Sequence, residues 1–267
     1  MSWLARKPSD HLVSMSAISR RRALGAGGAV GLGALIASCT GSGTPTRTAP
    51  VPTIDGGLAT VSPQTSTPAE LLELFPQSAS CALTPEETEG PYYFNANSIR
   101  GDIREDRQGT ALRLAMRVQD RSCTPIPNAI VDIWHCDASG LYSGFESVSR
   151  RGEIGGPRTD EETYLRGAQV TNGDGVVEFL TVYPGWYQGR TVHIHVKVHL
   201  DSRTVLTSQL YFDEAVTERV YARSPYLEQG ERDSFNRDDR SFEESLVMTI
   251  REDGDEYLGI MSMNVAG

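Results

Sequence analysis

The sequence is poor in positive charge. Its 267 residues contain 25 Lys and Arg against 35 Asp and Glu, which gives a formal net charge of −10 at pH 7. Residues 1–39 hold five of the basic residues and only one of the acids, so the rest of the chain is more acidic still. Binding to nucleic acid requires basic groups that neutralise phosphates. The composition therefore argues against nucleic acid as a partner.

Long apolar runs and helical periods are also lacking. The apolar run near the N-terminus, residues 23–37, is diluted by glycine, and at about fifteen residues it is too short for a stable membrane span. We find no internal repeat and no long segment with the period of a helix. These absences disfavour helical and repeat architectures.

The first 39 residues have the features of an export signal. Arg20, Arg21 and Arg22 precede the apolar run, and paired arginines there indicate twin-arginine export. Residues 35–39 resemble a lipoprotein box, in which Cys39 becomes the lipid-modified N-terminus. We expect an exported protein, on the outer face of the cytoplasmic membrane or in the periplasmic or extracellular space, with membrane contact only through a lipid anchor at Cys39. An uncleaved anchor helix and cleavage without acylation are the alternatives.

A linker is expected to follow the signal. Residues 40–68 are rich in Ser, Thr, Pro and Gly, and such a composition cannot bury enough apolar surface to fold. Residues 68–75 predict a short helix. We therefore assign residues 40–80 to the linker and residues 81–267 to the folded domain.

Cysteine is scarce, with four residues in the chain. If Cys39 is lipidated, Cys81, Cys123 and Cys136 remain, which permits one disulfide and one free thiol in an oxidising compartment. Cys123 and Cys136 flank an expected strand that would hold them too far apart to bond. Cys81 is thus expected to pair with one of them, and the sequence leaves open which.

Short segments of alternating polarity dominate the rest of the chain, and glycine-containing turns at 172–175 and 253–255 separate some of them. The pattern predicts an all-β fold, an antiparallel β-sandwich. Residues 213–244 are crowded with Asp, Glu and Arg and are expected to form a long polar excursion. The expected strands are 111–118, 129–135, 164–170, 176–180, 191–198, 206–211, 245–250 and 257–265.

One of these segments, residues 191–198, predicts half of a metal site. Side chains alternate faces along a strand, so His193 and His195 project the same way, roughly 7 Å apart, and can bind one ion. Tyr187 and Arg190 lie just upstream, and a phenolate is a hard donor that favours a highly charged ion. A solvated polar face is the alternative reading of the pair. We assign His199, further along the same face, to the surface.

A second stretch, residues 129–144, has the same design. An expected strand ends in a glycine-containing loop that presents Tyr142. We interpret Trp134 and His135 in this stretch, and Trp186 beside Tyr187, as packing or hydrogen-bonded structural residues. Asp132 and Asp137 have no base to pair with for acid–base chemistry, so they too are interpreted as structural.

The sequence resembles the intradiol ring-cleaving dioxygenases, the catechol, hydroxyquinol and protocatechuate enzymes, and most of all their exported, single-domain branch. The resemblance covers about residues 81–215. It rests on Glu89-Gly90-Pro91-Tyr92-Tyr93, Val131–Tyr142, Pro184-Gly185-Trp186-Tyr187, Arg190-Thr191-Val192-His193-Ile194-His195 and Gln209.

The resemblance implies a mononuclear, non-haem Fe(III) centre and a reaction with O2. The enzyme would insert both oxygen atoms between the hydroxyl-bearing carbons of a small aromatic diol of the catechol type, giving a muconate-type diacid. Arg190 would lie over the substrate ring, Gln209 would lie behind the ligands, and Tyr92 and Tyr93 would contact substrate at the pocket mouth. The implied ligands are Tyr142 and His193 in equatorial positions and Tyr187 and His195 in axial ones.

Elementary chemistry supports this implication. Two phenolates and one hydroxide cancel the three charges of Fe(III). Tyr187 would act as a switchable ligand and internal base, and Arg190 would stabilise negative charge on the ring. Two alternatives are an exported β-sandwich lipoprotein that binds a metal or a catechol-like ligand without turnover, and a zinc or copper site, which two tyrosines disfavour. The particular catechol and the oligomeric state are left open.

Overall fold

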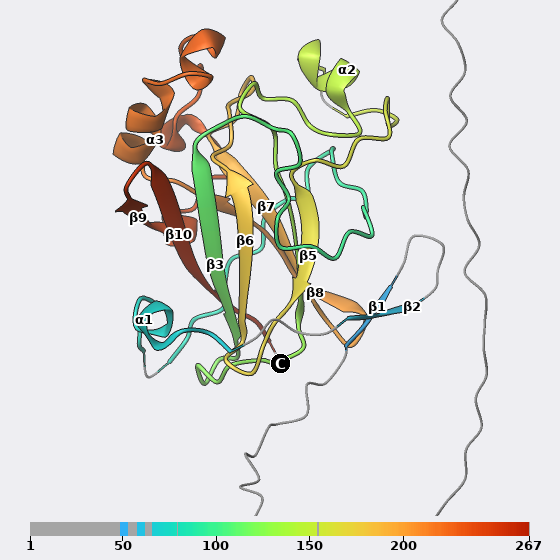
Figure 1. Ribbon diagram of the computed structural model, residues 1–267, viewed down its shortest axis with the longest axis vertical. Coiled ribbons are helices and arrows are strands. Elements are labelled where there is room, and N and C mark those ends of the chain that lie inside the picture. Colours follow the sequence, from blue (N-terminus) through green and yellow to red (C-terminus); the bar gives the residue numbers. More distant parts are fainter. Residues whose placement is uncertain (1–48, 53–57, 62–65, 79, 154, 267) are drawn as a thin grey trace, which may run out of the picture. The chain divides into compact units, whose positions relative to one another are not determined.

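The computed structural model describes residues 49–52, 58–61, 66–78, 80–153 and 155–266 (Figure 1). The expected export signal, residues 1–39, lies outside the described residues. In these described ranges, no helix is both long and apolar enough to cross a membrane.

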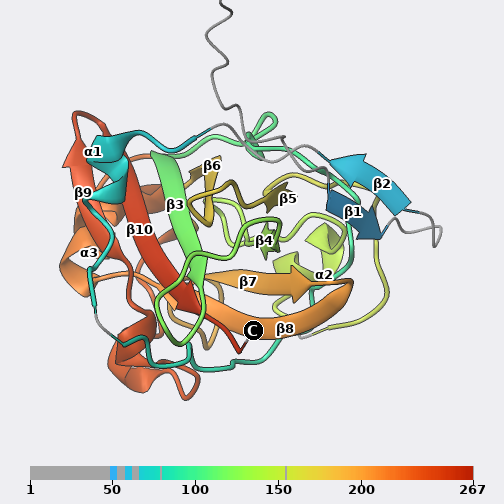
Figure 2. The ribbon, with the colours of Figure 1, turned by 90° about the horizontal axis from the view of Figure 1, so that it is seen from below.

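Two four-stranded sheets form the fold (Figures 1 and 2). The first has the strand order β6-β3-β10-β9 and the second has the order β5-β4-β7-β8. The first sheet consists of β3 (Ala111–Gln119), β6 (Val176–Val182), β9 (Thr249–Asp253) and β10 (Glu256–Asn264). The second consists of β4 (Ile130–Trp134), β5 (Arg166–Val170), β7 (His193–Leu200) and β8 (Arg203–Tyr211). A separate antiparallel pair is formed by β1 (Ala49–Pro52) and β2 (Leu58–Val61).

The predicted all-β sandwich is confirmed, and each of the eight expected segments overlaps a strand. The overlap is smallest at 245–250, which begins in a 3-10 turn and includes only the first two residues of β9. Neighbouring strands in the two sheets are antiparallel except β3 and β10, which pair in parallel. A parallel pair cannot be joined by a hairpin. Here residues 120–255, about half of the chain, lie between β3 and β10, and so long a connection permits the parallel direction.

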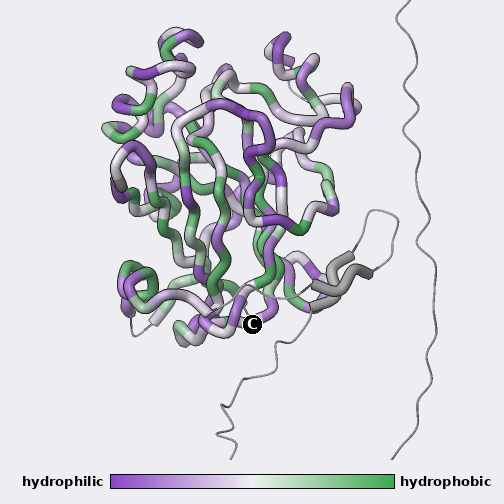
Figure 3. Tube along the Cα trace, in the orientation of Figure 1, coloured by the Kyte–Doolittle hydropathy of each residue, from purple (hydrophilic) through white to green (hydrophobic). Residues whose placement is uncertain are grey.

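The core lies between the two sheets. Val131 and Ile133 of β4 and Ile194 and Val196 of β7 are fully buried in one cluster with Leu114 of β3. Figure 3 shows hydrophobic residues running along these strands. Burying one such side chain stabilises the fold by about 1.5–3 kcal/mol relative to leaving it exposed. The inward face of β4 and β7 is thus taken by the core, and their other face is left for polar residues.

Short helical segments precede and connect the strands of the sandwich. They are α1 (Ala69–Leu72), α2 (Glu146–Arg150), α3 (Glu214–Tyr221) and the 3-10 turns η1 (Tyr226–Gln229), η2 (Asn236–Asp238) and η3 (Glu244–Leu246). Figure 1 shows α2 and α3 at one end of the sandwich and α1 near the other. Leu71 and Phe75 are buried with Ala115 and Ile260 of the first sheet, so packed residues begin upstream of residue 81.

The expected polar excursion at 213–244 proves to be more ordered than its composition indicated. Asp213 caps α3 by accepting hydrogen bonds from the N–H groups of Ala215 (2.9 Å) and Val216 (3.2 Å). Val216 and Val220 are buried in the main core. A helix of two turns has too few residues to give a long periodic pattern, which is why the sequence did not reveal it.

The disulfide joins Cys81 to Cys123, with a Cα–Cα distance of 5.4 Å. Cys136 is a free, buried cysteine. The expected single disulfide that includes Cys81 is confirmed, and the structure decides its partner. Cys136 is excluded because β4 places it at the opposite end of the strand from Cys123.

Replacing both Cys81 and Cys123 with serine should lower the free energy of unfolding by about 3–4 kcal/mol, because the bond closes a loop over a sequence separation of 42 residues. Chemical denaturation of the variant and of the oxidised wild type measures the difference. Adding reductant should lower the stability of the wild type by a similar amount and leave the variant unchanged. A wild type that is insensitive to reductant would contradict the expectation.

Candidate metal centre

The candidate centre lies on the face of the second sheet that points away from the core. His195 of β7 is aligned with Trp134 of β4 and Gln209 of β8, and His193 is aligned with Tyr211 of β8. All five residues are buried, because loops cover this face. One such loop passes so close that a Cβ on Gly90 would lie 3.0 Å from His195 Cε1, and its φ of +73° also favours glycine.

The loop after β4 carries Tyr142. Asp137 shapes it by accepting hydrogen bonds from the N–H groups of Ser139 (2.8 Å) and Leu141 (3.0 Å). Gly140 has φ +79°, and a Cβ there would lie 2.2 Å from the Trp186 carbonyl oxygen. Only glycine permits this approach, and the approach brings the Tyr142 loop against the loop that carries Tyr187.

The loop before β7 carries Tyr187 and Arg190. The Gly185 N–H donates to the Asp137 carbonyl (3.0 Å), which joins this loop to the previous one. The Arg190 N–H donates to the Tyr187 carbonyl (3.3 Å) and closes the turn. Residues of two loops that are distant in sequence are thereby placed over the same strand.

The four predicted ligands come together. Tyr187 Oη lies 3.1 Å from His193 Nε2, and His193 Nε2 lies 3.1 Å from His195 Nε2. The Tyr142 ring lies 5.6 Å from the Tyr187 ring and 6.2 Å from the His195 ring, measured between centroids. The Tyr142 hydroxyl is buried and makes no hydrogen bond of ordinary geometry, although Tyr187 is near enough to affect its pKa.

Contacts behind the histidines set their orientation. His193 Nδ1 lies 2.7 Å from the Thr191 carbonyl oxygen. A carbonyl only accepts, so Nδ1 holds the proton and the lone pair of Nε2 faces the other donors. The indole of Trp134 stacks on His195 with a centroid distance of 4.8 Å and an interplanar angle of 3°.

The donor set fits a hard, highly charged cation. Burial, together with the nearby Arg190, lowers the pKa of His193 to about 3, and burial lowers that of His195 as well. Burial raises the pKa of both Tyr142 and Tyr187 above that of a free phenol. A bound cation would stabilise the phenolate forms of both tyrosines and so lower these pKa values again. The described residues contain no group of three or more His, Cys, Asp and Glu suited to a metal. A metal held here would therefore need the tyrosine oxygens beside the imidazoles, and such hard donors suit Fe(III).

Arg190 and Gln209 adjoin this set. The Arg190 guanidinium donates to Gln209 Oε1 and, from Nε, to Asp239 Oδ2 at 2.8 Å. Gln209 Nε2 donates to the Thr88 carbonyl at 2.9 Å. The guanidinium is thus held by side chains from β8 and from the segment after η2.

The two predicted substrate-contact tyrosines lie in different surroundings. Tyr92 is buried, stacks on Tyr142 with a centroid distance of 4.6 Å, and donates from its hydroxyl to the Glu153 carbonyl at 2.6 Å. Tyr93 instead packs on Trp134 and donates to Asp132 at 3.1 Å. Tyr92 therefore packs directly on Tyr142, one of the predicted ligands, whereas the position of Tyr93 gives no support to substrate contact.

The residues interpreted as structural make structural contacts. His135 is buried between the Cys136 carbonyl (2.8 Å) and Thr181 Oγ1 (2.7 Å). His199 lies 3.0 Å from Thr204 Oγ1. Sequence reasoning missed Asp239, because nothing distinguishes this residue from the other acids of the 213–244 segment.

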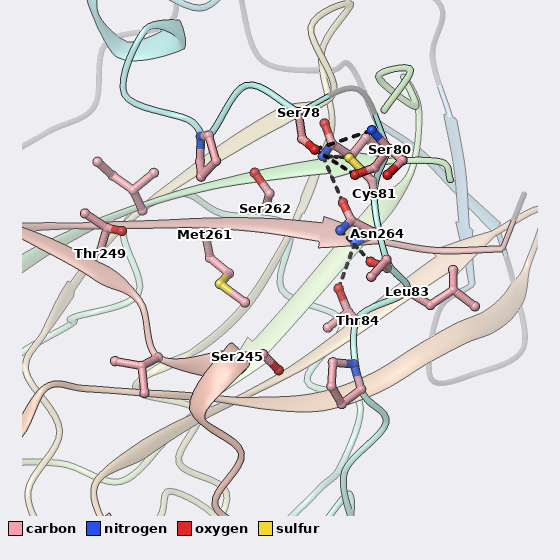
Figure 4. Close-up of a pocket in the computed structure, with 16 residues that line it drawn as sticks. Ser78, Ser80, Cys81, Leu83, Thr84, Ser245, Thr249, Met261, Ser262 and Asn264 are labelled. Atoms are coloured by element: carbon pink, nitrogen blue, oxygen red, sulfur yellow. Dashed lines mark hydrogen bonds between the residues drawn. The ribbon is translucent and has the colours of Figure 1, made fainter. Parts of the chain in front are cut away.

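A separate groove of about 420 Å³ lies beside β10 and the Cys81 loop (Figure 4). Ser78, Thr84, Thr249, Ser262 and Asn264 line it, with other neutral residues. It has no His, Asp, Glu, Lys, Arg or Tyr in its lining, so it offers no acid, base or metal ligand. The chemistry of the described residues is concentrated at the tyrosine–histidine centre instead.

Comparison with known proteins identifies relatives of this arrangement. Residues 88–229 match a protein-family model described as Dioxygenase. The structure is similar to that of an intradiol ring-cleavage dioxygenase from Tetranychus urticae, with 36% identity, a TM-score of 0.65, and coverage of 70% of this chain and 95% of that one. It is also similar to the dioxygenase domain of a dioxygenase carbohydrate-binding protein fusion from Streptomyces sp. SirexAA-E, with 30% identity, a TM-score of 0.53, and coverage of 69% and 99%.

Curated relatives match a shorter region. A chlorocatechol 1,2-dioxygenase from Rhodococcus opacus is 30% identical over 130 residues, and the match covers 42% of this chain and 47% of that protein. A catechol 1,2-dioxygenase from Acinetobacter baylyi is 30% identical over 141 residues, and the match covers 48% of this chain and 45% of that protein. The chain thus spans about half the length of the curated relatives it matches.

Proposed function

Because the chain belongs to the intradiol ring-cleaving dioxygenase family, we propose that it is a non-haem Fe(III)-dependent dioxygenase of catechol-type aromatics. It inserts both atoms of O2 between the two hydroxyl-bearing carbons and yields a muconate-type diacid. The observation that carries the proposal is the convergence of two buried imidazoles and two phenols on one point. The names of the curated relatives, catechol and chlorocatechol 1,2-dioxygenases, support this substrate class.

Tyr142, Tyr187, His193 and His195 would hold the iron. When bound, ferric iron supplies the chelation of the catechol and the activation of its ring toward O2. Tyr142 is fully buried, whereas Tyr187 is half-buried. Tyr187 is therefore the more accessible of the two phenols, and as a phenolate it would accept a proton from the arriving catechol.

Arg190 supplies fixed positive charge beside the ligands. Its guanidinium is held between Asp239 and Gln209, so it needs little reorganisation when negative charge develops on the substrate ring. A preorganised donor of this kind stabilises the transition state more than a mobile one.

We also propose that the protein works outside the cytoplasm. The disulfide between Cys81 and Cys123 supports this location, because such bonds persist mainly in oxidising compartments. The twin-arginine pattern and the lipoprotein-like box at Cys39 support export in the same way. Mass spectrometry of the membrane-associated and released protein tests both the cleavage and the acylation.

The function is tested by visible absorption of the iron-loaded protein. We expect a broad band from phenolate-to-Fe(III) charge transfer, a shift to longer wavelength on anaerobic addition of catechol, and bleaching with formation of a muconate when air is admitted. A colourless protein that binds zinc in stoichiometric amount, or binds no metal, would contradict the proposal.

The matched variants for this experiment are Tyr187→Phe and Tyr257→Phe. Both replace a tyrosine and keep the ring, but Tyr257 is buried in the main core. Only Tyr187→Phe should shift the absorption band and slow turnover. An unchanged spectrum and rate in Tyr187→Phe would remove Tyr187 from the site.

A further inference from the structure

Asp239 is a buried carboxylate directly behind the candidate centre. It follows η2, and its side chain is only 3% exposed. Its Oδ2 accepts hydrogen bonds from Arg190 Nε (2.8 Å) and from the Thr191 N–H (2.9 Å), and its Oδ1 accepts one from the Ser241 N–H (2.8 Å). Two of these three hydrogen bonds thus come from the segment that leads into β7, and the third comes from the turn that contains Asp239 itself.

The contact with Arg190 is a charged one. Burial by itself would raise the pKa of Asp239, but the Ser241 N–H and the Arg190 guanidinium outweigh burial, so the pKa lies below its ordinary value. The carboxylate is therefore ionised. Because the guanidinium also donates to Gln209, its plane is defined by acceptors on two separate elements, and a planar donor group held at two points loses its freedom to rotate.

The contact with Thr191 reaches a predicted metal ligand. The backbone N–H of Thr191 donates to Asp239, and the backbone carbonyl of the same residue accepts from His193 Nδ1 at 2.7 Å. The position of Thr191, which Asp239 helps to fix, therefore affects the tilt of the His193 ring. Contacts behind a metal-binding histidine set its orientation and its affinity for the metal.

We propose that Asp239 is a positioning residue of the dioxygenase reaction, which sets the Arg190 guanidinium beside the substrate and, through Thr191, the tilt of His193. This inference rests on the proposed function. Asp239 does not itself contact the four donors, so it acts through the residues that do.

A purely structural role, in which Asp239 only ties its segment to the sandwich, is the competing explanation. Other contacts already provide that tie. Asn236 Oδ1 accepts from Thr191 Oγ1 at 2.7 Å, and Tyr211 Oη donates to the Ser241 carbonyl at 2.7 Å. Loss of the Asp239 charge should therefore leave the segment in place and disturb chiefly Arg190.

Asp239→Asn tests the proposal in the iron-loaded, full-length protein. The amide keeps the shape of the side chain, but the negative charge that holds Arg190 is lost. An NH2 group also replaces one of the two acceptor oxygens, so a donor faces either Arg190 and Thr191 or the Ser241 N–H. We expect kcat for catechol to fall by about 10–100-fold, with KM within about threefold of wild type, because a misplaced transition-state group lowers kcat rather than substrate affinity. The control is Asp238→Asn, the same change at the exposed neighbour, with kcat within about twofold of wild type.

A second measurement does not depend on activity. In the iron-free protein with ¹⁵N-labelled arginine, the Arg190 Nε–H should exchange slowly with water in wild type and in Asp238→Asn, and rapidly in Asp239→Asn. Rapid exchange in the wild type would overturn the proposal even if the variant failed to fold. A variant with a lower melting temperature but wild-type kcat below that temperature would overturn it in favour of the structural role.

The outcomes separate this inference from the proposed function. A wild type that carries iron but does not cleave catechol would overturn the function, and the positioning role of Asp239 in that reaction with it. An active wild type together with a fully active Asp239→Asn would overturn only the positioning role.

Discussion

His193→Ala should lose its iron. The substitution removes one of four converging donors and the only one that is oriented by a hydrogen bond to the Thr191 carbonyl. Altering residues behind a metal ligand already weakens metal binding by about 10–100-fold, so loss of the ligand itself should cost at least ~100-fold in affinity. Iron per chain after dialysis, measured by elemental analysis, and the loss of the visible band check this result.

The matched control is His199→Ala. His199 lies on β7, on the same face as His193, but its ring contacts Thr204 Oγ1 rather than the other three donors. This variant should keep its iron and its colour. Melting curves of both variants show whether they fold, since His193 is buried and its removal leaves a void. Full iron stoichiometry in a folded His193→Ala would contradict the ligand assignment.

Arg190→Ala should lower kcat by about 10²–10³-fold while the iron stays bound. Loss of one preorganised donor at the site of developing charge has an effect of this size. The iron should remain because the guanidinium bonds to Asp239 and Gln209 rather than to the four donors. Steady-state kinetics with catechol and iron analysis of the same sample measure the two properties together.

Arg190→Lys separates the charge of this residue from its geometry. Lysine keeps the positive charge, but its ammonium lacks the planar fork that bonds to Asp239 and Gln209 at once. We expect a rate between those of wild type and Arg190→Ala. A wild-type rate in Arg190→Ala would show that the residue has no role in turnover, whereas loss of iron in that variant would place it among the groups that hold the metal.

Much of the candidate site could be predicted from the sequence because it depends on local geometry. The pleat of a strand obliges His193 and His195 to share one face, and a His-X-His pair needs no tertiary contact to do so. The two tyrosines precede or follow recognisable strands, and their spacing resembles that of a known family. The same alternation predicted the two-layer β fold.

Other features depend on contacts between distant parts of the chain. The partner of Cys81 was left open, because the sequence contains two cysteines that are chemically equal and only the packing brings Cys123 to it. Tyr92 and Tyr93 are adjacent and alike in sequence, yet one packs on Tyr142 and the other on Trp134. The parallel pairing of β10 with β3 likewise depends on contact between segments that are distant in sequence.

Asp239 shows most clearly the difference between features that depend on local sequence and features that depend on tertiary contacts. It lies 49 residues beyond Arg190, among many acids that are equally polar and carry no periodic pattern. The sequence by itself determined the β fold, the paired histidines and the two tyrosine loops, since neighbouring residues along a strand or turn define each of them. Only the tertiary structure decided which carboxylate and which tyrosine meet the centre, and which cysteine pairs with Cys81, because those contacts form when separate segments pack against each other.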